Sequence, residues 1–203
     1  MGNFINSTTL IPLIPLVTSI FIFILLVSFN RTINRLTKPV TALVSLSLLG
    51  SSFISAFAGS GVSYQIAVIT TDSSSFVGPI IDSSNPDPTA AFNSQIDSIG
   101  TGGSAHEKGL QYAYESTTTG DAAPGAGFQR PDARLVVVYV SDEPDHSSTG
   151  MTYTDYADSL KSLKSSLDLI VAHAIAGDYP AGCSANGGAQ FGEGYYEVVS
   201  QTA

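Results

Sequence analysis

The pattern of apolar and polar positions divides the chain into two unlike parts. From Leu10 to Phe29, twenty consecutive residues carry no charge. At about 1.5 Å rise per residue, a helix of this length crosses the roughly 30 Å hydrocarbon core of a bilayer. A second uncharged stretch from Pro39 to Ala58 contains five serines and a glycine, so it is less apolar than the first. The pattern predicts one or two transmembrane helices within residues 1–58.

A short basic loop separates the two apolar stretches and orients them. Arg31, Arg35 and Lys38 are the only charged residues among residues 1–60. Because Lys and Arg accumulate in cytoplasmic loops, we expect this loop to lie in the cytoplasm. A second span would then carry the rest of the chain to the outer side, periplasmic or extracellular.

An alternative interpretation treats part of this region as an internal signal sequence. Residues 31–38 would be its basic n-region and residues 40–54 its apolar h-region. The sequence Ala56-Phe57-Ala58 would then be an A-x-A cleavage site. Both interpretations predict that residues 61–203 lie outside the cytoplasm.

Three apolar runs after a linker at residues 59–63 have the length of β-strands. They are Tyr64–Asp72 (YQIAVITTD), Arg134–Ser141 (RLVVVYVS) and Leu169–Ile175. The second run is almost wholly apolar, as is typical of a parallel strand that is covered on both faces. We expect each run to form a buried strand.

Helical periodicity fills the intervals between these runs. Ser104-x-x-Glu107 and Thr152-x-x-Asp155 each predict a capping box at a helix start. The apolar positions behind them are Leu110, Ala113 and Tyr114, and then Tyr156, Leu160, Leu163 and Leu167. Shorter helices are expected over Thr89–Ile99 and Tyr195–Gln201, and a loop over residues 73–88. Alternating strands and helices predict an α/β domain over residues 64–203, with a doubly wound, mostly parallel sheet.

The charge is distributed as unevenly as the hydropathy. The net charge of −9 is the sum of +3 for residues 1–60 and −12 for residues 61–203. An acidic domain is a poor match for nucleic acid, whose phosphates require clustered Lys and Arg. The single cysteine, Cys183, cannot form an internal disulfide.

No pattern of catalytic residues stands out in the chain. Ser141 precedes Asp142 without the G-x-S-x-G elbow of hydrolases. The histidines, His106, His146 and His173, have no second His or Cys at metal-binding spacing, so a structural role is expected for each. The sequence therefore predicts a binding protein rather than an enzyme.

Acidic and hydroxyl side chains follow the predicted strands. In parallel sheets ligands bind at the carboxyl ends of the strands. Asp142, Glu143 and Asp145 crowd the end of the second strand, and such oxygen-rich clusters attract hard cations such as Mg²⁺ or Ca²⁺. The alternative is that these acids cap the loop and helix that follow.

Four motifs resemble the von Willebrand factor A-type domain. They are YQIAVITTD, GTGGSAHEKGL, RLVVVYVSDEPDHS and LDLIVAHAIAGDYPAGC, which occur in the family's order over residues 64–200. The resemblance implies an adhesion or binding module that recognises another protein through a metal-ion-dependent adhesion site or a loop surface. It also implies that Cys183 is half of a disulfide whose partner lies beyond Ala203.

The resemblance carries two of the three metal-binding elements onto this chain. Ser104 falls at the hydroxyl element, with Thr101 as its alternative, and Asp142 falls at the last aspartate. The family's Asp-x-Ser-x-Ser loop belongs before Tyr64, and residues 59–63 do not contain it. We therefore expect a defective or absent metal site, with weak Mg²⁺ or Ca²⁺ binding at most.

The first 57 residues are similar to a different family. The LIPLIPL span, the basic loop and the second apolar stretch resemble the N-terminal hairpin of the chain 5 (L-type) subunit of NAD(P)H-quinone oxidoreductases. That resemblance implies a fragment of a membrane oxidoreductase, or a chimeric chain, in which residues 61–203 are incidental. The longer resemblance, with its ordered motifs, favours a membrane-tethered binding module.

Overall fold

The computed structural model describes residues 50–100, 104, 106–118, 128–183 and 188–202. These residues belong to one compact unit, residues 47–203. The expected span Leu10–Phe29, the basic loop and the first part of the second apolar stretch lie outside the described residues. Within the described ranges, no helix is both long and apolar enough to cross a bilayer.

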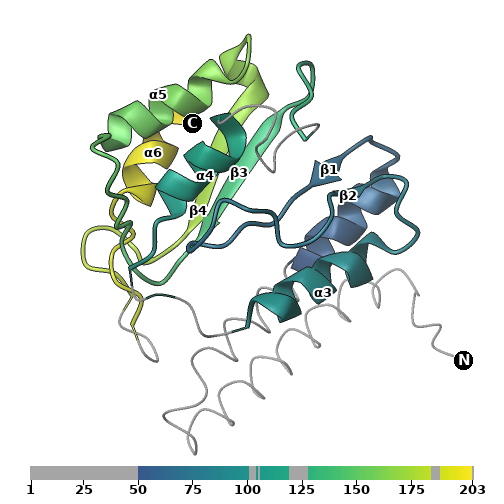
Figure 1. Ribbon diagram of the computed structural model, residues 1–203, viewed down its shortest axis with the longest axis horizontal. Coiled ribbons are helices and arrows are strands. Elements are labelled where there is room, and N and C mark those ends of the chain that lie inside the picture. Colours follow the sequence, from purple (N-terminus) through teal and green to yellow (C-terminus); the bar gives the residue numbers. More distant parts are fainter. Residues whose placement is uncertain (1–49, 101–103, 105, 119–127, 184–187, 203) are drawn as a thin grey trace, which may run out of the picture. The chain divides into compact units, whose positions relative to one another are not determined.

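The described residues form a mixed α/β structure, which confirms the fold class at that level (Figure 1). Residues 50–60 are helical. In chain order there follow β1 (Gln65–Ile66), β2 (Ile81–Asp82), α3 (Pro88–Ile99), α4 (Gly109–Thr118), β3 (Leu135–Val140), α5 (Tyr153–Ser162), the 3₁₀ turn η1 (Leu167–Leu169), β4 (Ile170–Ile175) and α6 (Tyr195–Thr202).

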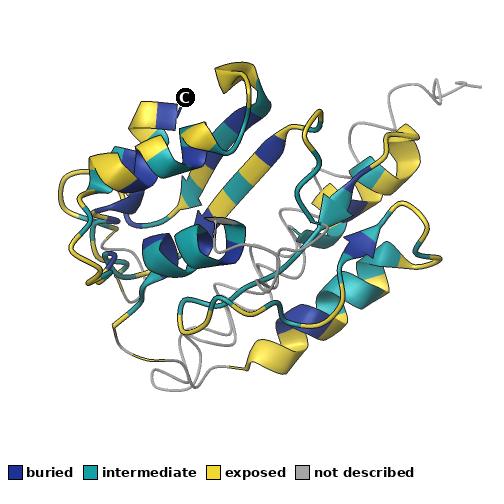
Figure 2. Ribbon diagram, turned by 45° about the horizontal axis from the view of Figure 1, so that its top comes forward, coloured by how far each residue is buried: buried dark blue, intermediate teal, exposed yellow. Residues whose placement is uncertain are grey.

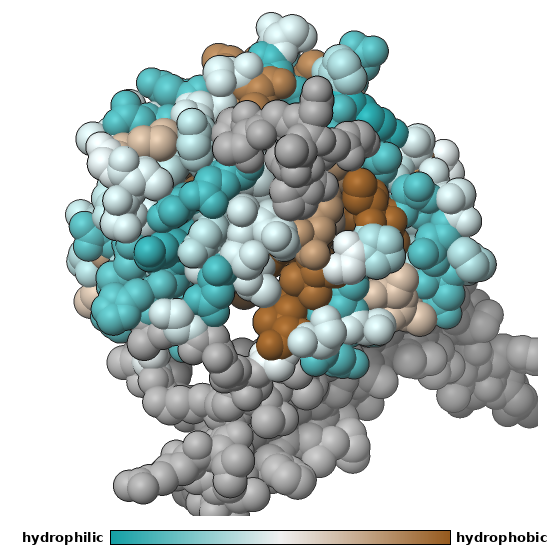
Figure 3. Space-filling view, in the orientation of Figure 1, coloured by the Kyte–Doolittle hydropathy of each residue, from teal (hydrophilic) through white to brown (hydrophobic). Residues whose placement is uncertain are grey.

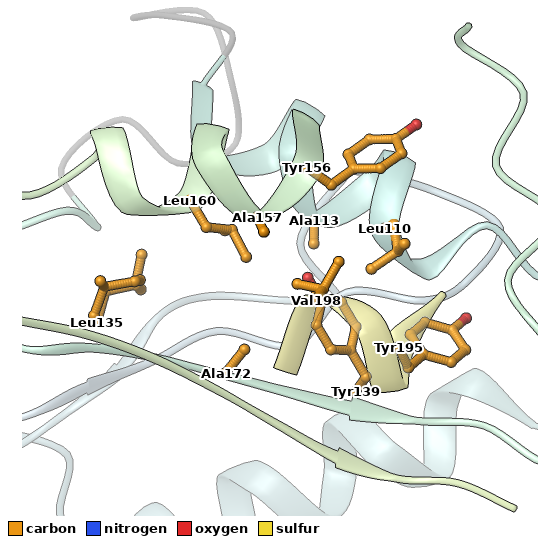
Figure 4. Packing of buried hydrophobic residues seen from close by; sticks show 11 residues of the cluster. Leu110, Ala113, Leu135, Tyr139, Tyr156, Ala157, Leu160, Ala172, Tyr195 and Val198 are labelled. Carbon is orange, nitrogen blue, oxygen red and sulfur yellow. The ribbon is translucent and has the colours of Figure 1, made fainter. Parts of the chain in front are cut away.

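The strands β3 and β4 form a parallel pair, which confirms two of the three expected strands. The register pairs Leu135 with Ile170 and continues to Val140 opposite Ile175. One face of this pair carries the hydrophobic core, because alternate residues along each strand point to the same side. The helices α4, α5 and α6 cover that face, and Figure 4 shows their apolar side chains directed toward the strands.

The opposite face of β3 is exposed among the described residues. Val136, Val138 and Val140 alternate with buried or half-buried positions along the strand, and Val138 is 49% exposed. Figure 2 shows this alternation as buried and exposed bands along the strand. Figure 3 shows an apolar strip at the surface between hydrophilic residues. Within the described part of the chain, the helices therefore cover only one face of the apolar run in β3.

The first expected strand is much shorter than predicted. Only Gln65–Ile66 is extended in a ladder, and it pairs antiparallel with Ile81–Asp82 inside the segment that was expected to be a loop. The expectation of a long buried parallel strand over residues 64–72 was wrong. A ladder extends only where a neighbouring strand supplies hydrogen-bond partners, and beyond Ile66 no described strand lies alongside. The chain bends back instead, with the Val77 N–H donating to the Val68 carbonyl at 2.7 Å.

The capping box at the start of α5 is confirmed, whereas the end of its apolar face was predicted wrongly. The Thr152 hydroxyl accepts the Asp155 N–H, and the Asp155 carboxylate accepts the Thr152 N–H. The helix ends at Ser162, four residues before the Ser166 side chain caps the next turn. Leu167 therefore lies in η1 and is 66% exposed, instead of continuing the buried face.

The helix over residues 50–60 lies beside α3. Ile54 is buried, and Ser51 and Ser55 form side-chain hydrogen bonds with Asn93 and Thr89. The helix extends through residue 60, so the expected linker at residues 59–63 begins within it.

Candidate functional site

The loop before α4 meets the segment that ends at Asp72. The Ser104 N–H donates to Asp72 Oδ2 at 3.0 Å, and the Lys108 N–H donates to the Thr71 carbonyl at 3.0 Å. The Ser104 hydroxyl accepts the His106 N–H at 3.1 Å, which closes a local turn. The structure thus brings the expected metal-binding serine next to Asp72. Thr101, the alternative ligand, lies outside the described residues.

Glu107 is directed into this region and does not complete the expected capping box. Its Oε2 accepts a hydrogen bond from the hydroxyl of Ser141, which follows β3. The helix begins only at Gly109, so neither Ser104 nor Glu107 occupies a capping position. The prediction of a capping box at Ser104 was wrong. The carboxylate of Glu107, which was expected to cap the helix, faces the end of β3 instead.

The turn after β3 is organised around the Ser141 hydroxyl. Besides contacting Glu107, this hydroxyl lies 2.7 Å from the Glu143 carbonyl and accepts the Glu143 N–H at 3.0 Å. Asp142 is exposed between them, and its backbone carbonyl accepts the Gln190 N–H at 2.8 Å. The Asp142 carboxylate therefore remains available to a ligand.

Four carboxylates shape the electrostatics of this region. Partial burial raises the pKa of the Glu107 carboxyl, the hydrogen bond from Ser141 opposes the shift, and the charges of Asp142, Glu143 and Asp72 raise the pKa further. Among the described residues, no Lys or Arg forms an ion pair with any of these four carboxylates. Like charges at close range favour a proton or an added cation.

Asp145 is part of the scaffold and not of an open cation site. It is buried, and its Oδ1 accepts the Leu110 N–H at 3.0 Å and the Ser147 hydroxyl at 2.9 Å. Its Oδ2 accepts the Ser147 N–H at 3.0 Å. Because both oxygens already accept hydrogen bonds, Asp145 is held in place by its neighbours and is less open to a cation than the exposed Asp142. Asp145 does bind Ser147 in the loop that follows, but the helix that it caps is the earlier α4 and not the following helix α5, which Thr152 caps.

A buried tyrosine hydroxyl lies beside the carboxylates. Tyr195 is buried at the start of α6 (Figure 4), and its hydroxyl lies beside the Gly109 backbone and the Ser141 side chain. A Cβ added at Gly109 would lie 2.7 Å from that hydroxyl, so glycine permits the close approach. Burial and the charges of Asp145 and Glu107 raise the pKa of Tyr195, which keeps the phenol neutral.

The fold also pairs two histidines that are 40 residues apart in the chain. The rings of His106 and His146 meet edge to face with centroids 5.1 Å apart. The backbone N–H of His146 donates to the backbone carbonyl of Glu107 at 2.7 Å, which holds the two loops together. Sequence spacing does not reveal this pair, because the contact depends on the loop after β3 crossing the loop before α4.

The arrangement offers oxygen ligands without a preformed metal cage. No group of three or more His, Cys, Asp or Glu side chains in the described part of the chain is placed to hold a metal ion. The Ser104 N–H donates to Asp72, and Asp145 is buried with both oxygens accepting hydrogen bonds, whereas Asp142 is exposed. A cation attracted here would keep most of its water ligands.

Comparison with known proteins adds no assignment. No protein-family model, curated protein or solved structure matches the chain.

Proposed function

We propose that this chain is a membrane-tethered, extracytoplasmic binding or adhesion module of the von Willebrand A type. Residues 1–58 would supply the attachment to the membrane, and residues 64–203 would present a loop surface to another protein. The domain would act by binding and not by catalysis. Its metal site would be defective or absent.

The observation that carries the proposal is the convergence of loops around Ser141. The von Willebrand A resemblance implies that Ser104 and Asp142 belong to one ligand-binding edge. In support, Ser104 lies against Asp72, and Glu107 from the same loop contacts Ser141, next to Asp142. The parallel register of β3 and β4 puts the loops that follow both strands at this edge. Convergent polar loops on a rigid sheet are a common setting for recognition.

The proposed location is testable through the only cysteine of the chain. Cys183 is exposed. Intact cells that express the full chain are treated with a membrane-impermeant reductant and then with a membrane-impermeant maleimide. Labelling of the wild type, and none of Cys183→Ser, is expected if the domain lies outside. Labelling that requires permeabilised cells would overturn the proposed location.

Membrane attachment is tested separately by alkaline carbonate extraction. The uncharged stretch Leu10–Phe29 is long enough to anchor the chain, so full-length protein should remain in the membrane pellet. Release of the full-length protein would contradict a transmembrane anchor. Release of a shorter species that begins at Gly59 would instead indicate cleavage after Ala58.

A further inference from the structure

Three aromatic side chains form a cluster after β4. Tyr179 and Tyr196 are stacked, with ring centroids 5.1 Å apart and planes at 20°. Phe191 meets both rings near edge-on, at 5.3 Å from Tyr179 and 5.9 Å from Tyr196. We refer to Tyr179, Phe191 and Tyr196 as the aromatic triad. It is separate from the hydrophobic core, to which none of the three belongs.

The two tyrosines of the aromatic triad are open to solvent, whereas Phe191 is half-buried. Tyr179 is 60% exposed and Tyr196 is 49% exposed. Neither hydroxyl forms a hydrogen bond within the described residues, so the two rings are not retained there by a polar partner. Aromatic residues gathered at a surface are typical of recognition sites, because a ring contributes a large contact area with little loss of conformational entropy.

Backbone hydrogen bonds hold the segments that carry the aromatic triad. The Gly192 N–H donates to the Gly177 carbonyl at 3.1 Å, and Phe191 forms a parallel bridge with Gly177. The Tyr196 N–H donates to the Gly192 carbonyl at 3.0 Å at the start of α6. A Cβ at Gly177 would overlap the Gln190 carbonyl oxygen, so this close approach requires glycine. The rings are therefore positioned in advance of binding.

The segment of the chain that carries the aromatic triad is acidic. Residues 165–203 contain no Lys or Arg. Their four acids are Asp168, Asp178, Glu193 and Glu197. Asp178 and Glu193 are exposed and directly flank segments of the aromatic triad, and the exposed Asp142 is linked to the same region through Gln190. The negative field of these carboxylates favours a cation over the ring faces and repels anions.

We propose that the aromatic triad, together with Asp178 and Glu193, binds an arginine or lysine side chain from a basic segment of a protein partner. The cation stacks on an exposed tyrosine face while its charge is balanced by the neighbouring carboxylates. This inference rests on the proposed binding function and specifies the chemistry of its partner. It requires no metal ion, so a defective metal site would leave it intact.

A neutral ligand is a weaker fit to the same surface. A sugar or a proline-rich peptide stacks on aromatic rings, but it gains nothing from the uncompensated charge of the flanking carboxylates. A cation uses both features at once, since the ring face and the carboxylates attract it together. Tighter binding of a neutral ligand is therefore a result that would contradict the proposal.

The test measures binding of fluorescent peptides to the full chain in detergent. The probes are a short oligo-arginine peptide, an oligo-lysine peptide, a neutral proline-rich peptide and a neutral oligosaccharide. We expect the arginine peptide to bind most tightly. Tyr179→Ala and Tyr196→Ala should each weaken it about tenfold, whereas Tyr179→Phe should retain binding because the ring face remains.

Matched controls separate stacking from the general attraction of a basic peptide to an acidic protein. Tyr112→Ala removes a tyrosine from α4 and should leave the affinity unchanged. Asp178→Asn should weaken binding, while Asp97→Asn, which removes an exposed acid from α3, should not. The two tyrosine substitutions leave the net charge of the protein unchanged, so a loss of affinity reports on the rings.

Two outcomes would overturn the inference. Wild-type affinity for the arginine peptide in both Tyr179→Ala and Tyr196→Ala would do so, as would tighter binding of a neutral probe through the same tyrosines. Thermal melts of each variant check folding, and the conservative Tyr179→Phe variant covers the case in which an alanine variant fails to fold. The maleimide experiment on Cys183 reports on location alone, so failure of one proposal is distinguishable from failure of the other.

Discussion

The carboxylate of Asp145 accepts the backbone N–H of Leu110 at 3.0 Å, across 35 residues of the chain. The loop after β3 thereby caps the first turn of α4, and the Ser147 hydroxyl accepts the next N–H, from Gln111, at 2.9 Å. The first N–H groups of a helix have no partner inside the helix. Here a neighbouring element supplies both acceptors, which ties the helix to the end of the sheet.

Removal of this cap should destabilise the protein. In Asp145→Ala the Leu110 N–H loses its buried acceptor and Ser147 loses its anchor, so we expect a decrease of about 2 kcal/mol in the free energy of unfolding. Asp145→Asn should lose less, because its amide oxygen still accepts a hydrogen bond. Denaturant titration of the full chain in detergent measures both. Asp97→Ala, on the exposed side of α3, is the control, and an equal loss there would refute the capping role.

The raised pKa of Glu107 predicts a specific pH dependence. Because partial burial raises this pKa in the folded protein, the folded state binds a proton more readily than the unfolded state. Stability contributed by the protonated form is present at acid pH and is lost as the pH rises from the ordinary pKa of a glutamate through the raised value. Glu107→Gln keeps a hydrogen-bond acceptor for Ser141 without the charge.

We therefore expect Glu107→Gln to be more stable than the wild type at neutral pH, with the difference shrinking as the pH falls through the raised pKa of Glu107 to the ordinary pKa of glutamate. Thermal melts across this pH range are the measurement. Glu115→Gln makes the same Glu-to-Gln change on α4 and serves as the control. It should not show this pH-dependent difference in stability. An unchanged pH profile in Glu107→Gln would show that this carboxyl does not carry the dependence.

The two faces of β3 should respond differently to truncation. Leu135 lies in the core, whereas Val138 lies on the exposed face. Leu135→Ala leaves a cavity and should lower the free energy of unfolding by about 3 kcal/mol. Val138→Ala should lower it by under about 1 kcal/mol, since little packing is lost. Comparable losses in the two variants would mean that another part of the chain or a partner covers the valine face.

Binding of a hard cation by the full chain should be weak. A hard divalent cation takes about six oxygen ligands, and Asp145 and Ser104 are already engaged in hydrogen bonds. We expect calorimetry to give millimolar or weaker affinity for Mg²⁺, with Asp142→Ala changing it little. Micromolar affinity that is abolished by Asp142→Ala would instead indicate a complete adhesion site.

The sequence by itself determined the elements whose signals are local. The apolar runs that became β3 and β4, the helix with Leu110 and Ala113 on its buried face, and the capping box between Thr152 and Asp155 all follow from the identities of nearby residues. Side chains three or four positions apart in a helix meet whatever the rest of the chain does. Such contacts are readable before the fold is known.

Only the tertiary structure decided the contacts between loops. Glu107 has the sequence position of a capping residue, yet its carboxylate meets Ser141 because α4 begins at Gly109 and Asp145 already caps it. The pairing of His106 with His146 and the stacking of Tyr179 on Tyr196 likewise join residues with no periodic relation in the chain. The order of strands and the path of each loop fix which distant residues meet, and no local pattern encodes that geometry.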